Sequence, residues 1–125
     1  MTKTKKRETG DIGEDVAAKY VANKGFFVLE RNYLRPWGEI DIVAQKDGKL
    51  RFIEVKTVSR VTKTGPRPEE NMHKHKLLRL NRAIQTYLLE KKVGESVGWQ
   101  IDLACVYLDF ETRRAKVELF ENIIL

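Results

Sequence analysis

The sequence predicts a single α/β domain in which helices flank a mixed central sheet. Two stretches of helical apolar spacing and several short apolar runs, separated by turn-forming residues, point to this class. A chain of 125 residues with a hydrophobic fraction of 42% is the size of one domain with its own core. We therefore expect one domain over residues 10–125, preceded by a flexible basic tail over residues 1–9.

The first half of the chain predicts one helix and two strands. Apolar residues recur at helical spacing over residues 11–24, and Gly25 then offers the left-handed conformation that ends a helix. Residues 26–32 and 39–45 are rich in apolar and aromatic side chains, which favours strands. The stretch 34–38 between them contains proline and glycine and predicts a turn.

The second half predicts a hairpin partner, a loop, a helix and two more strands. Asp47-Gly48 favours a tight hairpin turn into a third strand over residues 50–57. A loop that we expect to be mobile follows over residues 58–70, and then a helix over residues 71–92. Alternation over residues 101–105 predicts a fourth strand, and an end strand follows at residues 115–120. The order is αβββαβ plus an end strand, with a parallel join between strands three and four.

The hairpin register brings acidic residues together. If Asp47 and Gly48 form a type I′ turn, Asp41 faces Glu54 and Glu39 faces Lys56. All four side chains then share one face, while the opposite face takes Ile40, Ile42, Ile53 and Val55. Two facing carboxylates repel one another, so the pair favours a bound divalent cation such as Mg²⁺ or Mn²⁺. The simpler alternative is a polar outer face with weak ion pairs.

The basic charge of the chain is concentrated next to these residues. The net charge is +6, and residues 56–82 carry eight basic side chains against two acidic ones. This excess begins where the candidate site ends, which favours contact with a phosphate backbone. The basic residues that we expect to bind nucleic acid are Arg60, Lys63, Arg67, Lys74 and Lys76. For the basic tail a solubilising role is the simpler interpretation.

An ordered series of motifs accompanies the acids. They are Gly10-x-x-Gly13-Glu14-x-x-Ala17, Asn32-Tyr33, Gly38-Glu39-Ile40-Asp41 and Phe52-Ile53-Glu54-Val55-Lys56. Together they resemble the YraN family of uncharacterised proteins, which is similar to the PD-(D/E)XK nuclease superfamily and, within it, to the archaeal Holliday-junction resolvases. The family commonly has an arginine at two places where this chain has Val58 and Gln100. These departures affect positions expected to contact substrate and leave the acids intact.

The resemblance implies a fold and a set of roles. The fold would be a restriction-endonuclease-like αβββαβ core. Asp41, Glu54 and Glu14 would be catalytic acids that bind Mg²⁺ or Mn²⁺, with Glu14 contributed by the first helix. Lys56 would be the catalytic lysine. Resolvases further imply a homodimer.

Three functions fit the residues and the resemblance. The leading hypothesis is a Mg²⁺-dependent deoxyribonuclease, an endonuclease that hydrolyses phosphodiester bonds of DNA, branched DNA included. The first alternative is a nucleic-acid-binding or assembly module that keeps the fold without catalysis. The second is a nuclease that acts on RNA, because nothing in the sequence addresses the 2′-hydroxyl.

Other features of the sequence concern the cellular location of the protein and the roles of two histidines and one glutamine. A single cysteine, Cys105, and the absence of an apolar leader favour the cytoplasm, and no apolar run reaches the length of a membrane span. His73 and His75 stand two apart, which places them on different sides of a helix. Gln85 lies in a region where related nucleases have a polar residue near the site, but a solvent-facing glutamine is the equal alternative.

Overall fold

The computed structural model describes residues 4–59 and 74–123. The elements within these ranges are α1 (Lys5–Asn23), β1 (Phe27–Arg35), β2 (Gly38–Lys46), β3 (Lys49–Val58), α2 (Lys74–Glu90), β4 (Trp99–Asp109) and β5 (Arg114–Phe120). The described strands form one sheet in the order β1-β2-β3-β4-β5, with β3 and β4 parallel and the other neighbours antiparallel. The predicted mixed α/β fold class and its element order are confirmed, and they are consistent with a restriction-endonuclease-like core.

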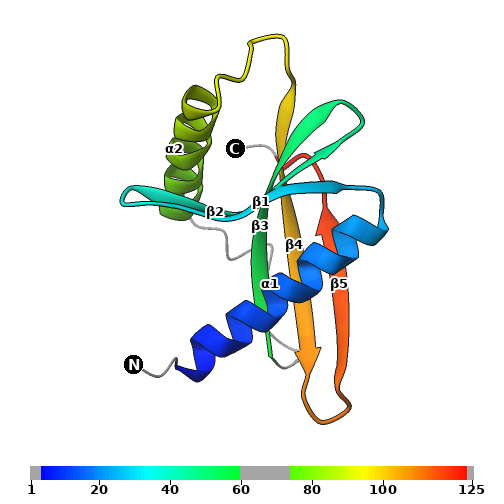
Figure 1. The fold of residues 1–125 in the computed structure, drawn as a ribbon. Coiled ribbons are helices and arrows are strands. Elements are labelled where there is room, and N and C mark those ends of the chain that lie inside the picture. Colours follow the sequence, from blue (N-terminus) through cyan, green and yellow to red (C-terminus); the bar gives the residue numbers. More distant parts are fainter. Residues whose placement is uncertain (1–3, 60–73, 124–125) are drawn as a thin grey trace.

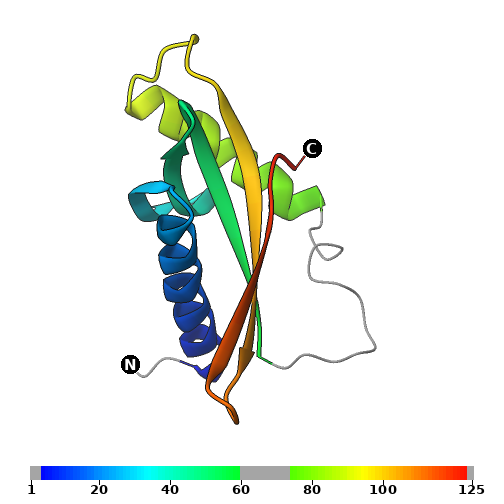
Figure 2. The same ribbon diagram turned by 90° about the vertical axis from the view of Figure 1, so that its right-hand side faces the viewer.

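The two helices cover opposite faces of the sheet (Figures 1 and 2). Phe52 of β3 packs with α2 residues such as Ile84, while the next residue, Ile53, packs with α1 residues such as Val21. All four side chains are fully or almost fully buried. Because successive side chains of a strand point to opposite faces, β3 therefore contributes to the apolar core on both faces of the sheet.

Helix α1 begins at Lys5, six residues before the predicted start. Thr4 caps it, because its side-chain oxygen accepts a hydrogen bond of 3.1 Å from the backbone N–H of Arg7. The basic tail expected over residues 1–9 is therefore helical from Lys5 onward. The first turns are exposed and carry no apolar spacing, so only the cap residue signalled this start. Gly25 follows the helix with φ +92, as predicted.

The β2–β3 hairpin has the predicted turn and register along most of its length. Asp47 and Gly48 both have positive φ, at 53 and 77, as a type I′ turn requires. Pairing runs from Lys46↔Lys49 to Ile42↔Ile53 and ends there, so the predicted ladder pair of Asp41 with Glu54 does not form. The register is thus confirmed for the hairpin and wrong at its open end.

The start of β2 bends away from β3 toward α2. Ile40 packs in the α2 cluster and Ile42 in the α1 cluster, so the prediction that they share a face is wrong. Gly38 explains the bend, since a Cβ at this position would lie 2.1 Å from the backbone oxygen of Arg79 in α2. Only glycine allows this close approach, and Figure 1 shows the β1–β2 arm reaching the side of the molecule that α2 occupies.

A buried ion pair ties the end of the described chain to the sheet. Asp102 in β4 is fully buried, and Arg51 Nη1 lies 3.1 Å from its Oδ2. Its Oδ1 accepts hydrogen bonds from Gln100 Nε2 at 2.8 Å and from the backbone N–H of Asn122 at 2.9 Å. Gln100, which departs from the family pattern, therefore has a structural partner here. Arg51 also reaches Glu121 at 3.2 Å, so the network holds residues 121–122 against β4.

Helix α2 ends at Glu90, two residues before the predicted end at 92, and the first three residues of the predicted range 71–92 lie outside the described part of the chain. Lys92 has φ 52, and the backbone N–H of Val93 donates to the Leu88 oxygen at 3.0 Å, which closes the helix. The predicted mobile loop over residues 58–70 lies outside the described residues from residue 60 onward. Across the described ranges, neither helix has the length and apolar character that a membrane span needs.

Candidate active site

Acids from three elements meet where β2 separates from β3. An open hollow of about 980 Å³ lies there, and its lining includes Glu14 of α1, Asp41 of β2 and Lys56 of β3. Lys76 of α2 also lines it. The separation of the two strands therefore lets α1 contribute Glu14 from one face of the sheet and α2 contribute Lys76 from the other.

Asp41 lies at the point where the ladder ends. Its Oδ2 accepts a hydrogen bond of 2.8 Å from the backbone N–H of Val55, which fixes the orientation of the carboxyl. Burial raises the pKa of Asp41 to about 8, and the charge of Glu54 adds to this rise. The Val55 hydrogen bond opposes it, and Glu14 and Glu39 contribute smaller rises. Without a cation, this carboxyl therefore tends to hold a proton near neutral pH.

Glu54 lies deeper than Asp41. It is 5% exposed, and Lys76 Nζ lies 2.8 Å from its Oε1. Burial raises the pKa of Glu54, whereas the charge and hydrogen bond of Lys76 lower it. A side-chain hydrogen bond with Asp41 also lowers this pKa, so the two carboxyl groups lie close together although their backbones do not pair.

Glu14 reaches the site because α1 packs closely on β3. A Cβ on the preceding residue, Gly13, would lie 1.9 Å from Thr57 Oγ1, so only glycine permits this approach. Glu14 is 9% exposed, and Arg31 Nη2 lies 3.4 Å from its Oε1. Burial raises the pKa of Glu14 and Arg31 opposes the rise. In the Gly13-Glu14 motif, the glycine therefore permits close packing of α1 on β3, and the adjacent glutamate reaches the site.

Lys56 and Lys76 both line the hollow but differ in their contacts. Lys56 lines the hollow, but in the described ranges no ion pair links it to a carboxylate. The cation that contacts Glu54 is Lys76, whose predicted role is nucleic-acid binding. Helical spacing could have revealed this, because Lys76 stands four residues before the buried Leu80 and seven before the buried Ala83. A lysine in line with a buried stripe predicts a buried partner for its charge.

The side chains of the remaining predicted residues either lie outside the described part of the chain or are exposed. Arg60, Lys63, Arg67 and His73 lie outside the described residues, and only the backbone of Lys74 is described. His75 is exposed, and the exposed Gln85 donates a hydrogen bond of 3.4 Å to Asn81 within α2. Within residues 4–59 and 74–123, no group of three or more His, Cys, Asp or Glu side chains is arranged to hold a metal ion.

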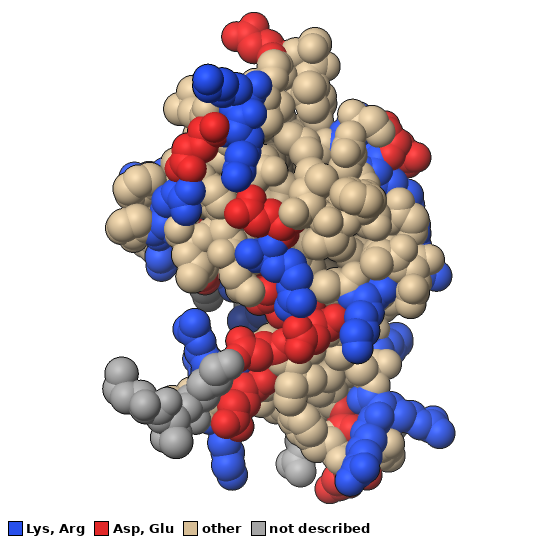
Figure 3. Space-filling model, viewed as in Figure 1, with Lys and Arg blue, Asp and Glu red and all other residues tan. Residues whose placement is uncertain are grey.

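The face that carries α1 has a distinct charge pattern. Figure 3 shows acidic side chains gathered over α1 in the middle of this face, with basic side chains around them. The acidic residues of α1 are Glu8, Asp11, Glu14 and Asp15. Arg31 of β1 contacts Asp15 at 2.7 Å and so neutralises part of the acidic charge.

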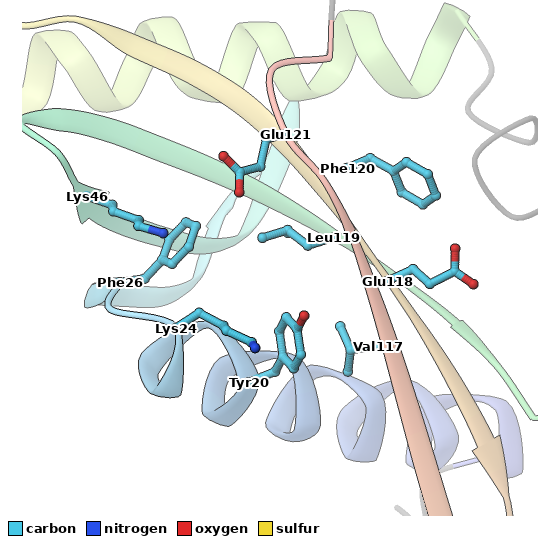
Figure 4. A pocket seen from close by; sticks show the side chains of 9 residues that line it. All are labelled: Tyr20, Lys24, Phe26, Lys46, Val117, Glu118, Leu119, Phe120 and Glu121. Atoms are coloured by element: carbon cyan, nitrogen blue, oxygen red, sulfur yellow. The ribbon is translucent and has the colours of Figure 1, made fainter.

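A second hollow, of about 500 Å³, lies between the end of α1 and β5. Figure 4 shows Lys46 beside the Phe26 ring and Lys24 beside Tyr20, and the nitrogen-to-centroid distances are 4.7 and 5.5 Å. Both ammonium groups thus rest on aromatic faces. Glu118 and Phe120 point away from these side chains (Figure 4), so the hollow lacks the convergent acids of the first one.

The fold and the site define a small mixed α/β domain with buried carboxyl groups at a break in its sheet. The model of the family described as "Uncharacterised protein family UPF0102" matches residues 13–106. The chain belongs to the UPF0102 family, which is the YraN family that its motifs resemble.

Curated relatives match along almost the whole chain. A UPF0102 protein of Moorella thermoacetica is 42% identical over 123 residues, which cover 98% of each chain. UPF0102 proteins of Campylobacter fetus subsp. fetus and Campylobacter lari are 36% and 39% identical over 114 residues, which cover 91% of each chain. The chain therefore has the length of these relatives.

Proposed function

We propose that this protein is a metal-dependent endonuclease that hydrolyses phosphodiester bonds of DNA. The observation that carries the proposal is the buried pair of Asp41 and Glu54 at the end of the β2–β3 pairing, where the Val55 N–H holds the Asp41 carboxyl at 2.8 Å and burial raises the pKa of both carboxyl groups. Two carboxylates that are both ionised and held together out of water are unfavourable unless a cation joins them. Branched DNA is the substrate class that the family resemblance favours.

The donor set fits Mg²⁺ or Mn²⁺. Both ions prefer oxygen ligands, and Mg²⁺ is commonly held by one or two carboxylates together with water and substrate phosphate instead of a complete protein cage. Asp41 and Glu54 supply such a pair, and Glu14 is close enough to Asp41 to raise its pKa. A bound divalent ion would make a water more acidic and offset phosphate charge.

The residues of the site would then have separate roles. Val55 N–H holds the Asp41 carboxyl in place through its 2.8 Å hydrogen bond, so that an oxygen is presented toward the hollow. Glu54 anchors the buried side of the site. Lys56 lines the hollow, where an ammonium group stabilises the negative charge that builds on phosphate during hydrolysis. The basic residues of the segment 56–82 would hold the nucleic-acid backbone.

A second candidate is a nucleic-acid-binding or assembly module without catalysis. It is favoured by the lack of a preassembled group of three metal-binding side chains among the described residues. A carboxyl with a pKa of about 8, as at Asp41, also tolerates the absence of a metal by staying protonated. The homodimer implied by the resemblance stays a prediction under either function.

Cleavage assays with Asp41→Asn separate the two candidates. Labelled linear, branched and single-stranded DNA and RNA would be incubated with protein and Mg²⁺ or Mn²⁺, or with chelator. We expect metal-dependent DNA cleavage by the wild type and its loss in Asp41→Asn, with DNA affinity equal or higher because a negative charge near phosphate is gone. Glu95→Gln, which removes an exposed charge elsewhere, is the matched control.

The possible outcomes assign the function. Cleavage that survives in Asp41→Asn would contradict the site, and cleavage of RNA alone would change the substrate class. If the wild type cuts no substrate with either metal, and Asp41→Asn binds DNA no differently, the binding module becomes the better description.

A further inference from the structure

Lys76 places a positive charge inside the acid cluster. Its Nζ lies 2.8 Å from Glu54 Oε1, and the Glu54 side chain is 6% exposed whereas that of Lys76 is 43% exposed. The lysine is the third residue of α2, so its stem starts at a half-exposed helix position and its ammonium ends at a buried carboxylate.

More than one carboxyl group raises the pKa of the Lys76 ammonium. Burial lowers the pKa of Lys76, but the charge and hydrogen bond of Glu54 outweigh it and raise the pKa. Asp41 and Glu39 add to this rise from farther away. Lys76 is thus held as a cation by the same carboxyl groups that would hold a metal ion.

Arg31, which also contacts the acidic cluster, has a second carboxylate partner outside the buried site. Arg31 approaches Glu14 at 3.4 Å but has its shorter contact, 2.7 Å, with the exposed Asp15. Arg31 therefore stays anchored if Glu14 changes partner. Within the described part of the chain, Lys76 forms an ion pair with Glu54 alone, so a competing cation at Glu54 would displace it.

We propose that Lys76 is the resident counter-cation of this site, which occupies the place of a divalent ion beside Glu54 and leaves when the metal binds. The inference rests on the proposed metal-dependent function. Lys76 and the metal then bind in competition, so the metal-free site avoids an unpaired buried carboxylate. Once displaced, the ammonium remains near the hollow that it lines, where a phosphate group would lie.

Direct binding of Mn²⁺ to the metal-free protein tests this competition without any cleavage assay. Free Mn²⁺ would be measured by electron paramagnetic resonance for the wild type, Lys76→Met, Lys76→Arg and Lys19→Met. Lys76→Met should bind Mn²⁺ about fivefold or more tightly than the wild type, the usual lower range of coupling between two ligands. Lys76→Arg keeps the cation and should stay close to the wild type. Lys19→Met, which removes an exposed charge of α1, should change affinity less than about twofold.

Two further variants keep the test decisive. Lys76→Gln should tighten Mn²⁺ binding as Lys76→Met does, and it replaces that variant if the methionine disturbs folding. Adding Glu54→Gln to Lys76→Met should remove the gain, because the competition takes place at Glu54. A gain that persists in the double variant would overturn the inference.

The inference and the proposed function fail in different ways. If the wild type binds Mn²⁺ and the neutral Lys76 variants bind it equally or more weakly, the competition is absent while the metal site stands. If neither the wild type nor any variant binds Mn²⁺, the metal site and the competition are both overturned.

Discussion

Asp41 owes its raised pKa to burial first and to Glu54 second. The order of the two causes matters, because a carboxyl that is shifted by burial gives up its proton when a cation replaces the lost solvation. Glu14 and Glu54 also have raised pKa values with burial as the largest cause. The three residues expected to bind metal therefore share one physical property that a set of surface ion pairs would not show.

The metal-free protein should lose stability as pH rises. A carboxyl whose pKa is higher in the folded state takes up a proton on folding, so ionisation at higher pH favours unfolding. For Asp41 the window runs from its ordinary value of 3.8 to about 8. Across it, the free energy of unfolding of Asp41→Asn should fall less than that of the wild type, by at least about 1.4 kcal/mol, the equivalent of one pKa unit.

Urea denaturation in the presence of chelator, from mildly acidic to mildly alkaline pH, measures this difference. Glu95→Gln serves again as the control and should follow the wild type. Parallel curves for the wild type and Asp41→Asn would mean that Asp41 ionises as an ordinary exposed carboxyl.

At the scale of elements, the contact of α1 with β3 depends on Gly13. Gly13→Ala places a Cβ against Thr57, at 1.9 Å from Oγ1 if nothing moves, and should destabilise the protein by about 1–3 kcal/mol. The helix would also shift Glu14 outward, so metal affinity should fall. Gly10→Ala is the matched control in the same helix, since a Cβ there meets nothing within 4 Å and should stabilise by about 0.5–1 kcal/mol.

Thermal denaturation and Mn²⁺ binding of the two alanine variants provide the comparison. Equal stabilities for Gly13→Ala and Gly10→Ala would show that α1 has room to move at Thr57. The close packing would then not be what positions Glu14.

The Arg51–Asp102 pair joins β3, β4 and the end of the described chain. Asp102→Ala leaves Arg51 buried with one partner fewer and should cost about 3–5 kcal/mol. The double variant Arg51→Met/Asp102→Leu should recover much of this loss, because an apolar pair of similar volume removes the unpaired charge. Urea denaturation checks both, and a loss below about 1 kcal/mol for Asp102→Ala would show that solvent reaches the pair.

At the scale of the whole molecule, the acidic cluster and the basic segment should act independently in one encounter with DNA. The triple variant of Arg60, Lys63 and Arg67 to alanine should weaken binding and flatten its salt dependence, with each lost phosphate contact lowering the log-log slope by about 0.9. Cleavage at saturating DNA should survive, because the acids are untouched.

Fluorescence anisotropy over a range of salt concentrations gives the slope. Alanine at Lys19, Lys49 and Lys116 removes the same charge from exposed positions elsewhere and is the control. A triple variant that keeps the wild-type slope would place the phosphate track on another part of the molecule.

The sequence by itself determined the fold class, the element order and the turn of the β2–β3 hairpin. These follow from local rules: the spacing of apolar residues decides helix or strand, and Asp47-Gly48 accepts the positive φ values of a type I′ turn. The family motifs likewise led to Glu14, Asp41 and Glu54 without coordinates. Thr4 is a local capping signal that apolar spacing does not reveal, and it places the start of α1 at Lys5.

Only the tertiary structure decided how the acids meet. The hairpin register predicted a ladder pair of Asp41 with Glu54, but Gly38 packs against the backbone of α2, bends β2 away and ends the pairing at Ile42. Lys76 meets Glu54 because α2 returns over the sheet, 22 residues later in the numbering. Contacts between elements distant in sequence depend on close packing of whole surfaces, and no local pattern of residues specifies them.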